Sequence, residues 1–236
     1  MIVRRADNAI QLITQPDHAH LARAIMDYCA PLAARPRRHS ILLAIGQHDN
    51  GWADEDAAPS VNPAAGSIVD FVGAPLSVRH AVWPRAVARL AADPWAAALV
   101  AQHAITVYDR FRPEREWAPF FSEMEASRDA ILRASDLSLE DLAGDYPFLR
   151  LGDLISLAFC TGATEEHRFG EWTIQLTGSR VFVAPDIFAD AQISVEIAAK
   201  EIPNQRFHTD AELGSALAGA KPVILRGEIA GRGTAV

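Results

Sequence analysis

Apolar residues recur with the period of a helix through most of the first 162 positions of the chain. A proline-bearing start signal at residues 15–17 precedes the first such segment. Further segments of this kind run over residues 41–45, 78–91, 95–111, 114–133 and 146–160, and a short helix is predicted over residues 137–143. The segment 95–111 is apolar nearly all round until His103, which predicts a helix at the centre of a helical core.

Two other parts of the chain alternate apolar and polar residues and predict strands. Residues 2–4 and 9–14 flank Asp7-Asn8 and predict an N-terminal hairpin. After residue 162, strands are predicted over residues 172–176, 180–183, 193–197 and 223–229. We therefore predict a mostly α (α+β) protein, with a helical core and hairpin over residues 1–162. Residues 163–236 are predicted to form a small antiparallel sheet packed on that core, because so short a segment buries little surface alone.

An adjacent His48-Asp49 pair ends the apolar run 41–45, and hydrophobic packing does not require this ending. A buried imidazole beside a buried carboxylate is costly unless each group is hydrogen-bonded or bound to a metal. One interpretation is structural, with Asp49 bonded to nearby backbone and His48 a satisfied core histidine. The other interpretation is functional, and it requires partner residues elsewhere in the chain.

Helical spacing predicts which other polar side chains point toward the core. His18 falls on the apolar face of the first helix, His103 on that of 95–111, and Asp153 on that of 146–160. His80, just before Pro84, is a further candidate. The remaining histidines stand in polar loops or on outward faces and are predicted at the surface: His20, His39, His167 and His208.

The composition is that of an ordinary globular protein, with 50% hydrophobic and 22% charged residues. The formal net charge of −8 repels nucleic acid phosphates and anionic membranes, so neither is expected as a partner. No stretch approaches the roughly 18 apolar residues of a membrane-spanning helix. Cys29 and Cys160 lie far apart in the sequence, and we predict that they are buried free thiols in a reducing compartment. We therefore expect a cytoplasmic protein, either a monomer or an oligomer.

The order of the inward-facing residues, one His, a His-Asp pair, a further His and a late Asp, resembles the HD-domain superfamily of metal-dependent phosphohydrolases. This resemblance implies an HD-like helical bundle around a divalent metal. It implies the metal ligands His18, His48, Asp49 and Asp153. It also implies that His103, together with His80, holds a second ion or contacts the substrate phosphate as an acid.

Four stretches are similar to domain-of-unknown-function family 3891, a family of bacterial proteins. They are Gln15–His18, His48–Trp52, Gln102-His103 and Leu151–Leu157. This resemblance covers nearly the full length of the chain and implies no particular activity.

Imidazole and carboxylate ligands suit Fe, Mn, Zn or Ni, so one or two such ions are the expected cofactor. A divalent ion lowers the pKa of a bound water from 15.7 to about 7 and so supplies a nucleophile. We predict hydrolysis of a phosphoester of a small molecule or nucleotide, with Asp49, His80 and His103 as catalytic residues. The alternatives are an HD-like oxygenase, in which iron activates dioxygen, and a non-catalytic helical module that binds a ligand or a metal.

Overall fold

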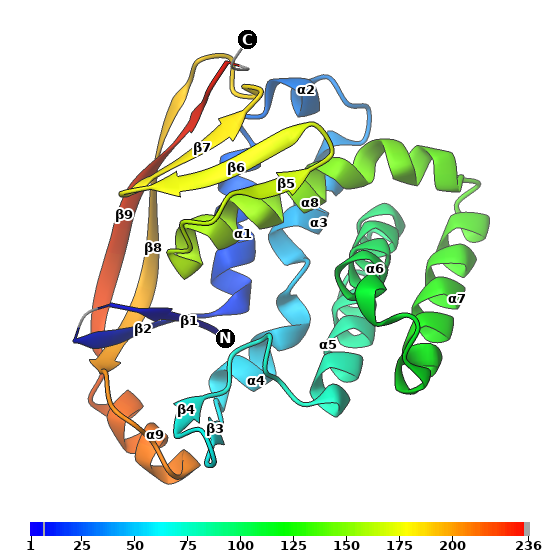
Figure 1. Ribbon diagram of the computed structural model, residues 1–236. Coiled ribbons are helices and arrows are strands. Elements are labelled where there is room, and N and C mark those ends of the chain that lie inside the picture. Colours follow the sequence, from blue (N-terminus) through cyan, green and yellow to red (C-terminus); the bar gives the residue numbers. More distant parts are fainter. Residues whose placement is uncertain (7, 234–236) are drawn as a thin grey trace.

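Two long strands, β8 (Gln192–Pro203) and β9 (Lys221–Gly231), form the middle of a curled sheet along one side of the molecule (Figure 1). The computed structural model describes residues 1–6 and 8–233. Apolar residues alternate with exposed ones along β8, so that its inner face turns Ile193, Val195 and Ile197 toward the helices. The alternation explains why this segment is a long strand that is polar on its outer side.

Within the described residues, the sheet has seven strands in the order β1-β2-β8-β9-β7-β6-β5. The other strands are β1 (Ile2–Arg5), β2 (Ala9–Ile13), β5 (His167–Phe169), β6 (Trp172–Thr177) and β7 (Arg180–Ala184). Neighbouring strands pair antiparallel except β7 and β9, which are parallel. The N-terminal hairpin enters this sheet through β2, whose Ile10 lies opposite Ile202 of β8.

The predicted fold class, an HD-like helical bundle with a small antiparallel C-terminal sheet, is wrong. The structure is an α+β fold in which a large mixed sheet joins both ends of the chain. The physical reason is that a two-stranded hairpin is marginal in water on its own and gains stability when it extends a larger sheet. The predicted hairpin itself is confirmed, although Asp7 of its turn lies outside the described residues.

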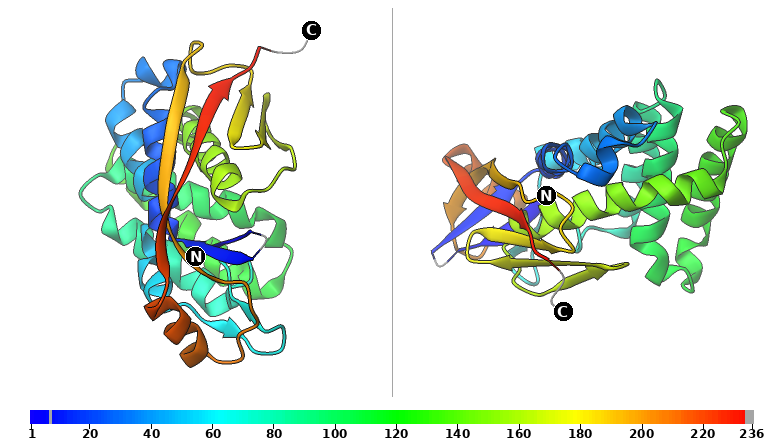
Figure 2. Two further views of the ribbon diagram at one scale, coloured as in Figure 1. Left: turned by 90° about the vertical axis from the view of Figure 1, so that its left-hand side faces the viewer. Right: turned by 90° about the horizontal axis from the view of Figure 1, so that it is seen from above.

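The helices pack against the inner face of the sheet and against one another. They are α1 (Gln15–Met26), α2 (Ala30–Ala33), α3 (Arg38–Gln47), α4 (Ala53–Ala57), α5 (Leu76–Arg89), α6 (Pro94–Tyr108), α7 (Ala118–Ala134), α8 (Leu139–Thr161) and α9 (Asp210–Ala218). Short 3-10 turns are η1 (Asn50–Trp52), η2 (Asp109–Phe111) and η3 (Arg115–Trp117), and a two-stranded ribbon pairs β3 (Val61–Asn62) with β4 (Ser67–Ile68). Figure 2 shows the sheet on one side, α5, α6 and α7 on the other, and α8 running between them.

The single helix α8 replaces the two helices predicted over residues 137–143 and 146–160. Ser138 accepts a hydrogen bond from the Asp141 backbone, and the Asp141 side chain accepts one from the Ser138 backbone, which fixes the start of the helix at Leu139. The helix then continues through Pro147 because it packs against α1, α3 and α6. As a result α8 runs through the middle of the molecule and carries Asp153 into the core.

Most buried side chains belong to one cluster, which extends from the inner face of the sheet through the packed helices. A smaller cluster lies at the end of the sheet that α9 covers, near β4. It includes Ile10, Ile202, Phe207 and Leu213. In residues 1–6 and 8–233, no helix combines the length and the apolar character needed to cross a bilayer.

Candidate metal centre

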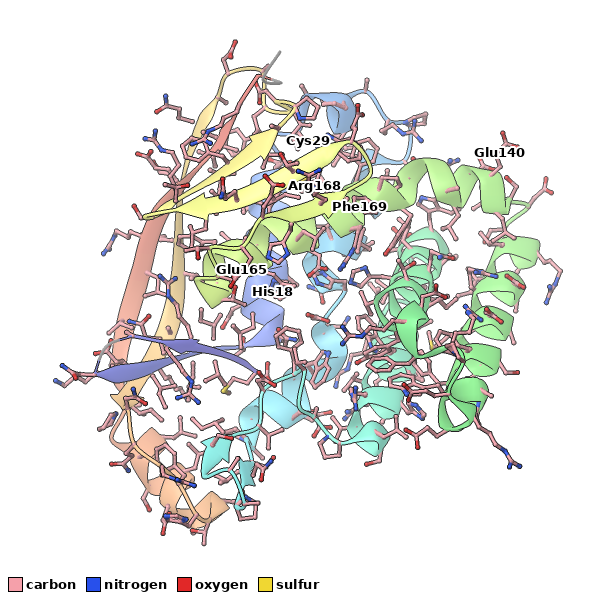
Figure 3. The ribbon with its side chains drawn as sticks, viewed as in Figure 1. His18, Cys29, Glu140, Glu165, Arg168 and Phe169 are labelled. Atoms are coloured by element: carbon pink, nitrogen blue, oxygen red, sulfur yellow. The ribbon has the colours of Figure 1, made fainter. Side chains whose placement is uncertain are left out.

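The predicted site residues except His80 meet in the core, and each arrives on a different element or at its end. His18 lies on α1 (Figure 3), His48 follows the last residue of α3, and Asp49 precedes η1. His103 lies on α6 and Asp153 on α8. All five side chains are buried, with at most 5% of each residue exposed.

Two glycines allow neighbouring backbones to come close beside this cluster. A Cβ added to Gly51 in η1 would lie 1.9 Å from the carbonyl oxygen of Val82 on α5. A Cβ added to Gly152 in α8 would lie 2.8 Å from the Cγ of Met26 on α1. A larger residue at Gly51 would push η1, next to Asp49, away from α5. A larger residue at Gly152 would push α8, which carries Asp153, away from α1.

The outer ring nitrogens of His18 and His48 have fixed roles. The Ser156 hydroxyl donates its one hydrogen to the His18 carbonyl at 2.7 Å, so it accepts from His18 Nδ1 at 2.9 Å. His48 Nδ1 donates to the carbonyl of Ile45 at 2.7 Å. In the neutral form of either ring, the hydrogen is therefore on Nδ1 and Nε2 carries a lone pair.

These Nε2 lone pairs meet two carboxylates at the centre of the cluster. His18 Nε2 lies 3.2 Å from His48 Nε2 and 3.0 Å from Asp49 Oδ2. His48 Nε2 lies 3.5 Å from Asp49 Oδ2 and 3.5 Å from Asp153 Oδ1. His18 Nε2 lies 3.7 Å from Asp153 Oδ1. Four atoms that can each accept a hydrogen bond thus converge, and a proton or a metal ion among them would offset their repulsion.

The spacing of these four atoms is close to that of ligands around one metal ion, and the His48–Asp49, His48–Asp153 and His18–Asp153 distances are slightly longer. Ligand bonds of about 2.1 Å place neighbouring ligands about 3.0 to 3.4 Å apart at octahedral or tetrahedral angles. The distances in the cluster run from 3.0 to 3.7 Å. Two groups of buried ligand atoms qualify by proximity, His18 with His48 and Asp49, and His48 with His103 and Asp153. These buried His and Asp groups could hold a metal ion.

His103 faces the second oxygen of Asp153. Its Nε2 lies 3.6 Å from Asp153 Oδ2, whereas Asp153 Oδ1 faces the other two histidines. Arg150 donates to the same Oδ2 at 2.6 Å, and the Tyr146 hydroxyl lies 3.3 Å from His103 Nδ1. Asp153 can therefore bridge two positions, one beside His18 and His48 and one beside His103.

The pKa shifts in the cluster follow from burial and from these contacts. Burial works to lower the pKa of His48, but Asp49 and Asp153 outweigh it and raise that pKa to about 9. Burial favours neutral carboxyls, yet His48 and His18 lower the pKa of Asp49, and His48, His103 and Arg150 lower that of Asp153. Burial lowers the pKa of His103 to about 3, which keeps its ring neutral. In the metal-free protein a proton on His48 therefore supplies the central cation.

The structure does not bring His80 into the cluster. Its ring lies on α5 and packs against Trp117 at 4.8 Å and Phe120 at 5.2 Å between ring centroids. The cause is helical phase, because α5 turns Trp83 rather than His80 toward His103, at 5.5 Å. Of the other histidines, His20, His39 and His208 are exposed as predicted, and His167 is half-buried.

A pocket of about 200 Å³ opens beside the cluster, and Asp49, His103 and Asp153 form part of its wall. Three arginines from different elements also line it: Arg79, Arg110 and Arg150. Aromatic and aliphatic side chains complete the wall, among them Trp52, Phe71, Trp83, Tyr108 and Leu154. Burial raises the pKa of Tyr108 to about 12, so its phenol stays neutral and can donate a hydrogen bond.

Sequence reasoning missed the arginines and the two side chains that orient histidines. Ser156 and Tyr146 stand 3 residues after and 7 before Asp153 on α8, the helical spacing of one face, and that spacing was the available signal. The arginines carried no comparable signal, because single arginines are ordinary on helix surfaces.

The chain belongs to the family described as protein of unknown function (DUF3891), whose model matches residues 1–204. The predicted resemblance to this family is thereby confirmed, whereas these comparisons give no support to membership of the HD-domain superfamily. No curated protein and no solved structure matches the chain.

Proposed function

We propose that this chain is a metal-dependent hydrolase that cleaves a phosphoester of a small molecule. The observation that carries the proposal is the convergence of His18 Nε2, His48 Nε2 and two carboxylates around one point, while both Nδ1 atoms are held by other groups. Metal-bound histidines in proteins have this arrangement, since the hydrogen bond at the outer nitrogen fixes the ring and its tautomer.

The proposed ligands of a first ion are His18, His48, Asp49 and Asp153. Two imidazoles and two carboxylates suit Fe, Mn, Zn or Ni. A second ion would bind Asp153 Oδ2 and His103 Nε2, which lie 3.6 Å apart on the pocket side of the cluster. His103 is otherwise placed to contact the substrate directly, because it lines the pocket.

When bound, such an ion lowers the pKa of a coordinated water to about 7 and so makes a nucleophile at neutral pH. The chain's own groups supply the remaining requirements. Asp49 lines the pocket and can accept a hydrogen bond from the attacking water, which orients it, and Arg150 lies beside Asp153, where it can pair with a phosphoryl oxygen. The apolar walls exclude bulk water, which strengthens each of these interactions.

The arginines of the pocket favour a phosphoester over a neutral substrate. The chain has a net charge of −8, yet Arg79, Arg110 and Arg150 gather around one small pocket. Of the three, Arg150 contacts the centre through Asp153, and a guanidinium next to a metal centre suits a transferring phosphoryl group, whose charge it stabilises in the transition state. The volume of about 200 Å³ fits a small molecule, and the net charge argues against nucleic acid or an anionic membrane as the partner.

The test is a panel of phosphomonoesters and phosphodiesters with protein reconstituted separately with Mn, Fe, Zn and Ni. We expect release of phosphate or alcohol with at least one metal, and loss of this activity in His48→Ala, because the variant lacks a proposed ligand of the ion. His20→Ala is the matched control, since His20 lies on α1 two residues from His18 but is exposed. It should keep full activity.

Two results would overturn the proposal in favour of its competitors. Metal-loaded protein that hydrolyses no member of the panel would indicate a binding module. Oxygen consumption by the iron form, without release of phosphate, would indicate an oxygenase.

A further inference from the structure

Two of the three pocket arginines have no acidic partner among the residues that the structure describes. Arg150 is paired with Asp153, but no carboxylate lies within 4.0 Å of the guanidinium nitrogens of Arg79 or Arg110 in the described ranges. Arg79 Nε is also buried without a hydrogen-bond partner there. A buried donor left unpaired is costly, and its presence in a pocket wall points to a partner from outside the chain.

Two neighbouring arginines outside the pocket do have carboxylate partners, although Arg85 Nε, like Arg79 Nε, is buried without a hydrogen-bond partner among the described residues. Arg85, on the same helix as Arg79, donates to Asp54 at 2.9 Å and to Glu55 at 2.7 Å. Arg112, two residues after Arg110, donates to Asp109 and to Glu125, each at 2.9 Å. Arg79 and Arg110 thus lack the carboxylate that these two neighbours have. Other arginines of the described residues, such as Arg23 and Arg115, lack one too, and what sets Arg79 and Arg110 apart is their place in the pocket wall.

Arg79 and Arg110 contact the same aromatic ring. Their guanidinium carbons lie 5.5 Å and 4.6 Å from the centroid of the same ring, that of Phe111. Arg79 also lies 5.3 Å from the ring centroid of Trp117. The two positive charges therefore lie within about 10 Å of each other, and an anion bound by both would offset their mutual repulsion.

A row of rings connects this arginine pair with the metal centre. Ring centroids are separated by 5.5 Å from His103 to Trp83, by 6.1 Å from Trp83 to Tyr108, and by 6.2 Å from Tyr108 to Phe111. Trp83 and Tyr108 therefore stand between the carboxylates of the centre and the arginine pair. A ligand that reaches both ends would lie along an aromatic wall, which suits a flat apolar body.

We propose that Arg79 and Arg110 bind a second anionic group of the substrate, separated from the group at the metal centre by a flat apolar body. The identification of that first group as a phosphoryl rests on the proposed function. Arg79 and Arg110 are specificity-determining residues in this account, and Trp83 and Tyr108 form the wall between the two charged ends of the substrate.

The test compares two rigid probes, phenylphosphonate and 4-phosphonobenzoate, which differ by one carboxylate. Calorimetric titration of the full metal-loaded chain should give about tenfold tighter binding of 4-phosphonobenzoate, as one charged hydrogen-bonded pair provides. The double variant Arg79→Gln/Arg110→Gln should bind both probes equally. Arg112→Gln removes the same charge from a paired residue, and it should keep the tenfold preference.

The single variant Arg110→Gln guards against loss of folding, because Arg110 is exposed and its replacement leaves the core untouched. It should lower the preference to about threefold while phenylphosphonate binding is unchanged. Equal affinity of the two probes in the wild type, or a preference that survives in the double variant, would overturn the proposal. A wild-type preference in a protein that hydrolyses no phosphoester would instead overturn the proposed function alone, since the titration needs no turnover.

Discussion

Helix α8 carries two buried aspartates, Asp145 and Asp153, whose negative charges are balanced by different kinds of neighbour. Both are almost inaccessible, with exposures of 1% and 3%. Both lie on the face of α8 that packs into the helical core, and both have an arginine beside them. Their other partners differ, and that difference separates a structural site from a candidate metal centre.

Asp145 is satisfied by donors alone. Arg35 Nε donates to Oδ1 at 2.8 Å, Arg37 Nε donates to Oδ2 at 3.0 Å, and Trp95 Nε1 donates to Oδ2 at 3.1 Å. Each of these groups carries its hydrogen at every ordinary pH. The buried charge is therefore balanced by the chain itself and needs no ion.

Asp153 receives one permanent donor, Arg150, and its other neighbours are a carboxylate and histidines whose Nε2 atoms donate to it only when the ring is protonated. The Nε2 atoms of His18 and His48 are lone pairs in the neutral rings, and Asp49 adds a second carboxylate. The comparison shows that burial of an aspartate is not itself a sign of function. The feature that indicates a metal site is an excess of hydrogen-bond acceptors over donors, with the acceptors held in place by other groups.

Replacing Asp145 should have the largest effect on the stability of the fold. Asp145→Asn leaves two arginines partly buried without their carboxylate, and we expect a loss of about 3 to 5 kcal/mol in the free energy of unfolding by denaturant. Measured in EDTA, Asp153→Asn should cost less, because it also removes the repulsion between Asp153 and Asp49. Equal losses of unfolding free energy in the two variants would contradict the view that Asp145 is a structural residue and Asp153 is not.

Metal should stabilise the protein through Asp153 and not through Asp145. Free metal at a hundred times its dissociation constant should add about 2.7 kcal/mol to the stability of the wild type. The same increment is expected in Asp145→Asn, and none in Asp153→Asn. Thermal unfolding with and without the ion measures this, and a full increment in Asp153→Asn would contradict the ligand assignment.

The hydrogen bond between Ser156 and His18 Nδ1 should account for a smaller effect on metal affinity. Ser156→Ala frees the His18 ring, and we expect affinity to fall by about 10- to 100-fold in competition titrations with a chelator. Thr161→Val removes another hydroxyl from α8, one that bonds the Leu157 carbonyl of its own helix. It should leave the affinity unchanged, and similar losses in both variants would mean that Ser156 acts only through the stability of α8.

His80 should show the smallest effect, since it lies outside the cluster. His80→Phe keeps the stacking on Phe120 and Trp117, and we expect a change in stability of about 0.5 kcal/mol or less. Metal content and hydrolysis should match the wild type. Loss of bound metal in this variant would mean that His80 takes part in metal binding, as the sequence predicted.

The buried positions of the cluster could be predicted because polar residues on an apolar helical face stand out in the sequence. His18, His103 and Asp153 were found in this way, and His48-Asp49 by its place at the end of an apolar run. The sheet could not be predicted, because its pairings are distant in sequence, with Ile10 opposite Ile202 and Val181 beside Ile229. Arg79 and Arg110 were missed because their role comes from missing partners, which only the structure reveals.

The most direct test of the central claim is elemental analysis of the purified protein after exposure to Mn, Fe, Zn and Ni. The account predicts one or two transition-metal ions per chain in the wild type and in Asp145→Asn. It predicts that His48→Ala retains none at the first site. A wild type that binds no metal, or a His48→Ala variant that binds the full amount, would contradict it.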